Sequence, residues 1–212
     1  MRPALEPEVD SLSVQGPHAE QVLSHSTQFV CRALAAIENL TGCPIPCENH
    51  GHATVFVDNA YVDVHSCPSL CIASSSLLHD STVVEQAFDT ARKLVHGLVQ
   101  QWFGLGALVR PESSYSLWLV QGLAGHVTNL CLRKLLGNNA YVYHVFRETE
   151  ATCATDTTLV SNSPMHPFET MSVDKERKAT LVMRLIEKRW ATLLLLLLLL
   201  YLVCILNFRK LT

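Results

Sequence analysis

Residues 96–104 read His-Gly-Leu-Val-Gln-Gln-Trp-Phe-Gly, and this stretch decides how the rest of the chain is interpreted. It closes a segment in which apolar residues recur every three or four positions, which is the spacing of one face of a helix. That pattern predicts a long helix over residues 82–103, ending near Gly104. The residues on the predicted face are Val84, Phe88, Ala91, Val95, Leu98 and Trp102.

This helix has the register of a zinc-binding helix in which the metal-binding side chains have changed. A zinc-peptidase helix carries His-Glu-x-x-His, where both His side chains reach the metal and the Glu is the general base. Here His96 is present, but Gly97 stands at the Glu position and Gln100 at the second His position. A glycine cannot take a proton, and a neutral amide is a poor zinc ligand. We therefore expect no catalytic residue, no metal and no cofactor.

Two blocks carry a resemblance to a peptidase family. The stretch from His96 to Gly104 resembles His-Glu-Leu-Ala-His-Gln-Trp-Phe-Gly of the aminopeptidase N family. Trp118 to Ala124, Trp-Leu-Val-Gln-Gly-Leu-Ala, resembles that family's Trp-Leu-Asn-Glu-Gly-Phe-Ala, whose Glu is the third zinc ligand. The resemblance implies that Gln121 stands in place of this ligand.

Two further features of the aminopeptidase N family have no counterpart. The family's Gly-Ala-Met-Glu-Asn motif, which grips the free amine of a substrate, would fall within residues 66–76, which hold no acidic residue. The family's catalytic tyrosine would precede the helix at 178–187, yet no tyrosine lies between Tyr143 and Tyr201. The resemblance therefore implies a pseudo-metallopeptidase that acts as a scaffold.

One branch of this superfamily resembles the chain over more of its length. The second subunit of the general transcription factor TFIID, a TBP-associated factor, has an aminopeptidase-like domain with a degenerate zinc site. Blocks similar to it are Thr54–Val64, Val99–Gly104, Trp118–Gly125 and Gly137–Tyr141, within a match over roughly residues 25–189. Family members are far longer, so the resemblance implies a fragment of one domain.

Periodicity and turn residues predict an α+β, largely helical fold, as a fragment of a thermolysin-like, gluzincin aminopeptidase-type domain. The expected helices cover 19–39, 82–103, 117–135, 140–146 and 175–189, and the expected strands 53–57, 61–64 and 70–73. Helix 19–39 should end at Gly42 and Pro44, and helix 117–135 at Gly137. Helix 175–189 should bury Leu181, Val182, Leu185 and Ile186, and helix 117–135 should bury Val120, Ala124, Val127 and Cys131.

The ends of the chain differ in character from the middle. Residues 1–18 form a polar leader without a signal-type apolar stretch, and residues 19–189 form the domain. Residues 190–208 are a Leu-rich apolar segment followed by a short tail, 209–212. The apolar segment is a candidate membrane span, since a span takes about 20 residues. Because helix 178–187 still follows the family pattern, we favour a truncated or misjoined gene product for this tail.

Three other groups of residues allow a functional interpretation beside a structural one. A zinc site could form from Cys43, Cys47, Cys67 and Cys71 with His50, His52 and His65, although free cysteines are commonly core residues. The cations Lys175, Arg177, Lys178, Lys188 and Arg189 read as a solvated helix face in preference to a phosphate-binding patch. Tyr141, Tyr143 and Phe146 read as core packing in preference to base stacking.

The resemblance implies a non-catalytic subunit or fragment of TFIID that acts in preinitiation-complex assembly at core promoters, in the nucleus. Its partners would be other TFIID subunits, with promoter DNA only through the full-length protein. The net charge of −3 gives no general attraction to nucleic acid. Two alternatives stay open: a membrane-anchored inactive aminopeptidase-like protein held by residues 190–208, and an active zinc aminopeptidase with unusual ligands.

Overall fold

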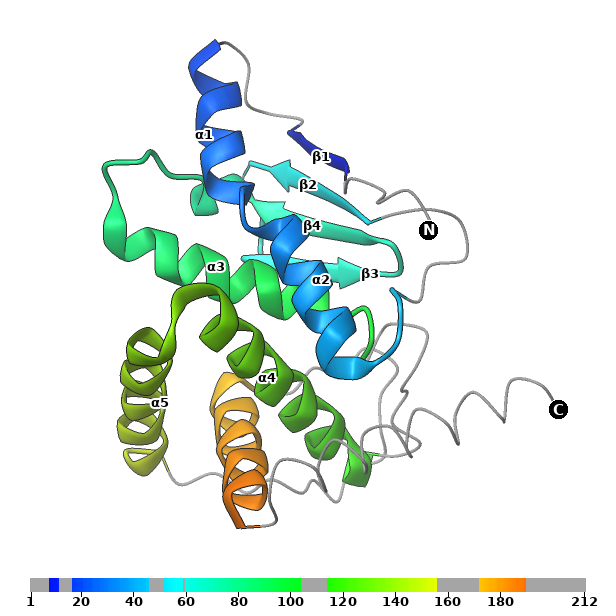
Figure 1. Ribbon diagram of the computed structural model, residues 1–212, viewed down its shortest axis with the longest axis vertical. Helices are drawn as coiled ribbons and strands as arrows, with labels where there is room; N and C mark the ends of the chain where they lie inside the picture. The colour runs from blue at the N-terminus through cyan, green and yellow to red at the C-terminus, as the bar shows by residue number, and fades with distance from the viewer. Residues whose placement is uncertain are drawn as a thin grey trace, which may run out of the picture.

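The computed structural model describes residues 8–11, 17–45, 52–58, 60–103, 114–155 and 172–189. For residues 8–11, 17–19 and 114–116 it describes the backbone alone. A small sheet lies beside a layer of helices (Figure 1). The strands are β1 (Glu8–Ser11), β2 (Ala53–Val57), β3 (Val64–Cys67) and β4 (Leu70–Ser74). The helices are α1 (Pro17–Thr27), α2 (Val30–Thr41), η1 (Ser75–Leu77), α3 (Val84–Val99), α4 (Ser114–Leu136), α5 (Asn138–Cys153) and a further helix over 173–189. The expected α+β, largely helical class is confirmed.

The sheet has the order β1-β2-β4-β3, in which β1, β2 and β4 are parallel and β3 is antiparallel to β4. β2 and β4 have the expected positions. β1 was not expected, because it lies in the segment read as a polar leader, whose residues carry no alternating apolar pattern. It pairs with β2 through backbone groups, with Glu8 opposite Ala53.

The prediction of a strand over 61–64 is wrong, because β3 begins only at Val64. Tyr61 is fully exposed, and residues 61–63 form a bend. The turn at Pro68 and Ser69, where Ser69 has φ 64°, sets Cys67 opposite Leu70 and fixes the register of β3 and β4. The Lys93 ammonium lies 3.0 Å from the Asp63 carboxylate and ties the bend to α3.

The first expected helix is two helices, α1 and α2. At the break, the Ser26 hydroxyl donates to the Val22 carbonyl and the Thr27 hydroxyl donates to the Leu23 carbonyl. Such side-chain hydrogen bonds compete with the backbone hydrogen bonds of a helix and weaken it. α2 ends as expected, since Gly42 has φ 68° and its N–H donates to the Glu38 carbonyl.

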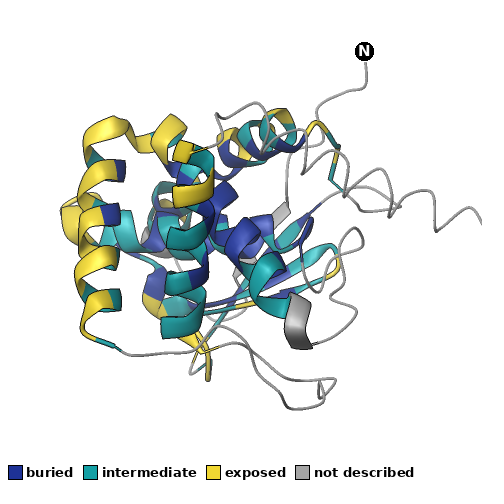
Figure 2. Ribbon diagram, turned by 90° about the horizontal axis from the view of Figure 1, so that it is seen from below, coloured by how far each residue is buried: buried dark blue, intermediate teal, exposed yellow. Residues whose placement is uncertain are grey.

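The core joins α2, α3, α4 and the inner side chains of the sheet. Figure 2 shows the buried residues gathered in the interior, with exposed residues on the outer helices. The expected α4 face is confirmed, because Val120, Ala124, Val127 and Cys131 are all buried. α3 is shorter than expected, and Val84 is 80% exposed, whereas Trp102, in the turn after α3, is buried.

The two outer helices depart most from expectation. α5 is longer than the expected 140–146, and Tyr143 and Phe146 are 62% and 58% exposed, so only Tyr141 of that aromatic set is buried. The helix over 173–189 buries Ala179 and Met183.

The expected buried face of the 173–189 helix is wrong, since Leu185 and Ile186 are exposed and Leu181 and Val182 only half-buried. Glycines on α4 explain the difference. A Cβ at Gly122 would lie 2.9 Å from the Ala179 carbonyl oxygen, so the helices meet at their small residues.

Several expectations fall on residues outside the described ranges. These are the Leu-rich segment 190–208, the tail 209–212, Cys47, His50 and the loop between α3 and α4. Within the ranges that the structure describes, no helix combines the length and the apolar character that crossing a bilayer requires.

Candidate functional site

The residues singled out from the sequence meet where α3 ends against α4. His96 and Gln100 lie one turn apart on the same face of α3, with Gln100 as its C-cap residue. The Gln100 amide nitrogen lies 3.0 Å from His96 Nε2, and it donates to Gln121 Oε1 of α4 at 2.7 Å. The three residues expected at the zinc-ligand positions are thus brought together, and they are joined by hydrogen bonds.

A threonine on α4 fixes the state of the His96 ring. The Thr128 hydroxyl donates to the Ala124 carbonyl at 2.8 Å, so its oxygen accepts from His96 Nδ1, 3.3 Å away. With the proton on Nδ1, the lone pair of Nε2 faces the Gln100 amide N–H. Burial lowers the pKa of His96, Glu176 acts in the opposite direction and Arg92 lowers it further, which keeps the ring neutral.

Glu176 is a member of this group that sequence reasoning missed. It lies in the first turn of the helix over 173–189, and its carboxylate oxygen Oε1 lies 3.1 Å from His96 Nε2. No spacing in the sequence links the two residues, which are far apart along the chain. The only available signal was an acidic residue at the start of a helix, a common feature of helices in general. We name the group of His96, Gln100, Gln121, Thr128 and Glu176 the polar network.

Gly97 lies against the sheet, in a space that holds no side chain. A Cβ at this position would lie 2.6 Å from Val64 Cγ1 and 3.4 Å from both Cys71 Sγ and Ser66 Oγ. The Ser66 hydroxyl also donates to the Gly97 carbonyl at 2.9 Å. α3 therefore approaches β3 and β4 as closely as it does because residue 97 is glycine.

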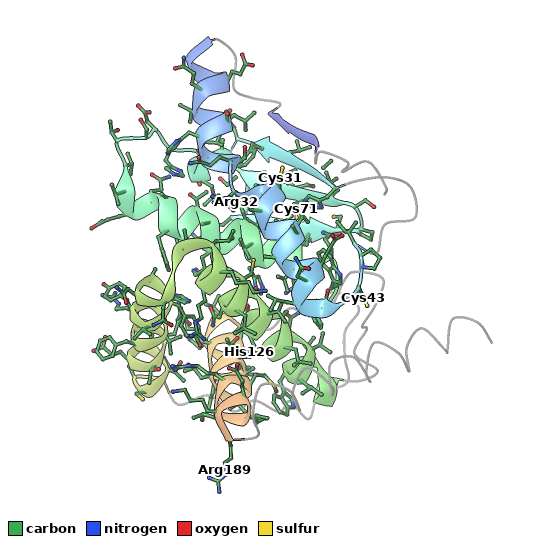
Figure 3. The ribbon with its side chains drawn as sticks, viewed as in Figure 1. Cys31, Arg32, Cys43, Cys71, His126 and Arg189 are labelled. Atoms are coloured by element: carbon green, nitrogen blue, oxygen red, sulfur yellow. The ribbon has the colours of Figure 1, made fainter. Side chains whose placement is uncertain are left out.

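The segment 66–76, where the substrate-amine motif of the aminopeptidase N family would fall, contacts the turn that follows α3. The backbone N–H of Ser69 donates to Gln101 Oε1 at 3.0 Å, and the Gln101 amide nitrogen lies 3.8 Å from Cys71 Sγ. Burial raises the pKa of Cys71 to about 11, so this residue, labelled in Figure 3, is a thiol at neutral pH and no nucleophile.

The described members of the possible cysteine and histidine zinc site do not come together in the structure. His52 is buried, and its Nε2 lies 3.1 Å from the Thr54 hydroxyl, while His65 is exposed. Burial lowers the pKa of His52 to about 4. Among the described residues no three His, Cys, Asp or Glu side chains are placed to hold one metal ion.

Comparison with known sequences finds subunit 2 of TFIID from several organisms. The transcription initiation factor TFIID subunit 2 of Danio rerio is 31% identical over 134 residues, which are 63% of this chain and 11% of that protein. The subunit 2 of Gallus gallus is 29% identical over 134 residues, and that of Schizosaccharomyces pombe is 34% identical over 93 residues, 44% of this chain and 8% of that protein. The chain thus spans about a tenth of the length of the curated relatives it matches. No protein-family model matches it.

Comparison with solved structures gives the fold. Native leukotriene A4 hydrolase from Saccharomyces cerevisiae aligns with a TM-score of 0.65 at 14% identity, over 88% of this chain and 30% of that one. An M1 zinc metallopeptidase from Deinococcus radiodurans, solved as a mutant, aligns with a TM-score of 0.59 at 13% identity, over 92% of this chain and 38% of that one. The chain is therefore similar in sequence to subunit 2 of TFIID, and its fold is the gluzincin fold of these two solved structures.

Proposed function

We propose that this chain is a non-catalytic, aminopeptidase-like part of a TFIID subunit, and that it acts in preinitiation-complex assembly at core promoters. Its partners would be other TFIID subunits, and its compartment the nucleus. Promoter DNA would be a partner only through a longer protein. The sequence similarity to TFIID subunit 2 supports this assignment.

The observation that carries the absence of catalysis is the polar network itself. In a zinc peptidase, the residues at these positions hold the metal and leave a water for reaction. Here the Gln100 amide bridges His96 and Gln121 at hydrogen-bonding distances, so the space between the ligand positions is spanned by protein groups. The network then serves to hold α3 and α4 together through the Gln100–Gln121 hydrogen bond.

The position of the general base supports the same proposal. A glutamate at position 97 would have to grow from a Cβ that meets Val64, with Ser66 and Cys71 close on the other sides. The closed space gives a structural reason for glycine at this position, beyond the loss of the carboxylate. The chain would thus be a pseudo-metallopeptidase in which the former catalytic face has become packing.

Two experiments separate this proposal from its rivals. Capture of the epitope-tagged chain from nuclear extract should recover TBP and identified TBP-associated factors, which the membrane-anchored and enzymatic rivals do not predict. Fractionation should place the tagged chain in the nucleus. Recovery in alkaline-washed membranes without TBP-associated factors would contradict the proposal and favour the anchored rival.

A further inference from the structure

A second feature lies at the opposite end of the 173–189 helix from Glu176 and uses no residue of the polar network. α5 and this helix lie side by side (Figure 1) and run in opposite directions. Arg177 Nε lies 3.3 Å from Glu148 Oε2 at one end of the pair, and the Arg184 guanidinium lies over the Tyr141 ring, 5.6 Å from its centroid, at the other. Tyr141 and Glu148 are seven residues apart, and so are Arg177 and Arg184. The two helices are therefore paired over two turns.

A cavity of about 370 Å³ lies at the Tyr141 end of this pair, where the last turn of α4 joins it. Arg133 of α4 also lies over the Tyr141 ring, 5.5 Å from its centroid. The cavity is lined by Arg133, Arg184, Lys188, Tyr141, Val142 and Glu187, among others. We name it the cationic pocket.

Among the described residues that line the pocket, cationic side chains outnumber carboxylates. Arg133, Arg184 and Lys188 form no salt bridge within the described residues. Among the described residues that line the pocket, the carboxylate is Glu187, and its Oε2 lies 3.4 Å from Nε2 of His126 on α4. The lining of the pocket therefore carries an excess of positive charge, which favours an anionic ligand.

Exposed apolar side chains continue from the edge of the pocket. Val142, which lines the pocket, is 50% exposed, and Phe146, one turn further along α5, is 58% exposed. On the facing helix, Leu185 is 66% exposed and lies three residues before Lys188. Large apolar side chains beside a cationic cavity favour a ligand that has both carboxylates and apolar groups.

We propose that the cationic pocket docks an acidic, apolar-containing segment of a partner protein, with its carboxylates on Arg133, Arg184 and Lys188 and its apolar side chains on Val142 and Phe146. Charge complementarity and the apolar border both fit such a segment. A nucleic-acid backbone fits less well, because it needs a long basic track and the chain as a whole carries a net charge of −3. The inference does not rest on the proposed function.

The test uses two pairs of matched charge reversals in the full chain. Arg133→Glu and Lys134→Glu change neighbouring exposed residues of α4, of which only Arg133 lines the pocket. Lys188→Glu and Arg189→Glu change neighbouring exposed residues of the 173–189 helix, of which only Lys188 lines the pocket. Arg189 projects away from the end of this helix (Figure 3).

The binding probe is a fluorescein-labelled peptide of about 12 residues that alternates Asp or Glu with Leu or Phe, followed by fluorescence polarisation. A peptide with Asn and Gln in place of the acids is the control ligand. Circular dichroism and urea unfolding verify that each variant is folded, and the Lys188 pair keeps the test valid if Arg133→Glu unfolds.

Reversal at Arg133 or Lys188 should weaken binding about tenfold or more, and reversal at Lys134 or Arg189 by less than about threefold. The control peptide should bind at least about tenfold more weakly than the acidic one. The proposal is overturned if the acidic peptide does not bind, if both members of each pair weaken it equally, or if the control peptide binds as well. The proposal is also overturned if duplex DNA binds more tightly than the acidic peptide and loses affinity on reversal of Arg133 and Lys188. The ligand of the pocket would then be a nucleic-acid backbone.

Discussion

Filling the space beside Gly97 should destabilise the protein, although alanine is the better helix residue. Gly97→Ala inside α3 would by itself stabilise the helix by up to about 1 kcal/mol. The new Cβ lies 2.6 Å from Val64 Cγ1, closer than carbon atoms approach, and Cys71 and Ser66 limit its escape. Overpacking of this kind costs about 1–3 kcal/mol. The net effect should therefore be a loss of unfolding free energy of up to about 2 kcal/mol.

Val64→Ala removes the obstructing methyl groups and supplies the control. Urea unfolding of the two single variants and the double variant measures the coupling between the sites, which should be about 1–3 kcal/mol in favour of the double variant. Gly97→Glu should be less stable than Gly97→Ala, because it also places a carboxylate in the same closed space. A stability gain of about 1 kcal/mol for Gly97→Ala, with no coupling to Val64→Ala, would refute the close approach of α3 to the sheet.

Three further outcomes follow from the packing and the site. Trp102→Ala should lower the unfolding free energy by about 3–5 kcal/mol, since the side chain is 1% exposed, and an unchanged melting curve would contradict that packing. Burial and the nearby Arg184 hold the pKa of His126 at about 4, against an ordinary 6.5, so the unfolded chain takes up the proton first and stability falls as pH drops from 6.5 to 4. Urea unfolding at pH 7 and pH 5 should show about 2 kcal/mol of this loss, and a His126→Gln variant with the same loss would contradict it. The triple variant Gly97→Glu, Gln100→His and Gln121→Glu should not hydrolyse a leucyl reporter, because catalytic groups act as a unit and the helix has no room for the glutamate; turnover above the parent would contradict this.

The elements with a strong local signal could be predicted from the sequence. α4 follows from a clear apolar stripe, and the end of α2 follows from Gly42, which takes the left-handed conformation that ends helices. The meeting of His96, Gln100 and Gln121 could be predicted because two of them share a helix face and the third lies in a second motif block.

The remaining features depend on tertiary contacts that leave no local pattern. β1 is held through its pairing with β2, which requires no alternation of side chains. The helix over 173–189 turns Ala179 toward α4 because the glycine at position 122 allows a close approach, so the larger Leu185 stays outside. Glu176 joins the polar network for the same reason, since the docking of that helix decides where its first turn lies.

The zinc content of the purified chain, measured by mass spectrometry of the metal, tests the central claim most directly. Because Gln100 and Gln121 form hydrogen bonds to each other at the ligand positions, the chain should hold well below about 0.1 zinc per molecule after dialysis against buffer with trace zinc. About one zinc per chain, lost in a His96→Ala variant, would contradict the account and favour the active-peptidase alternative.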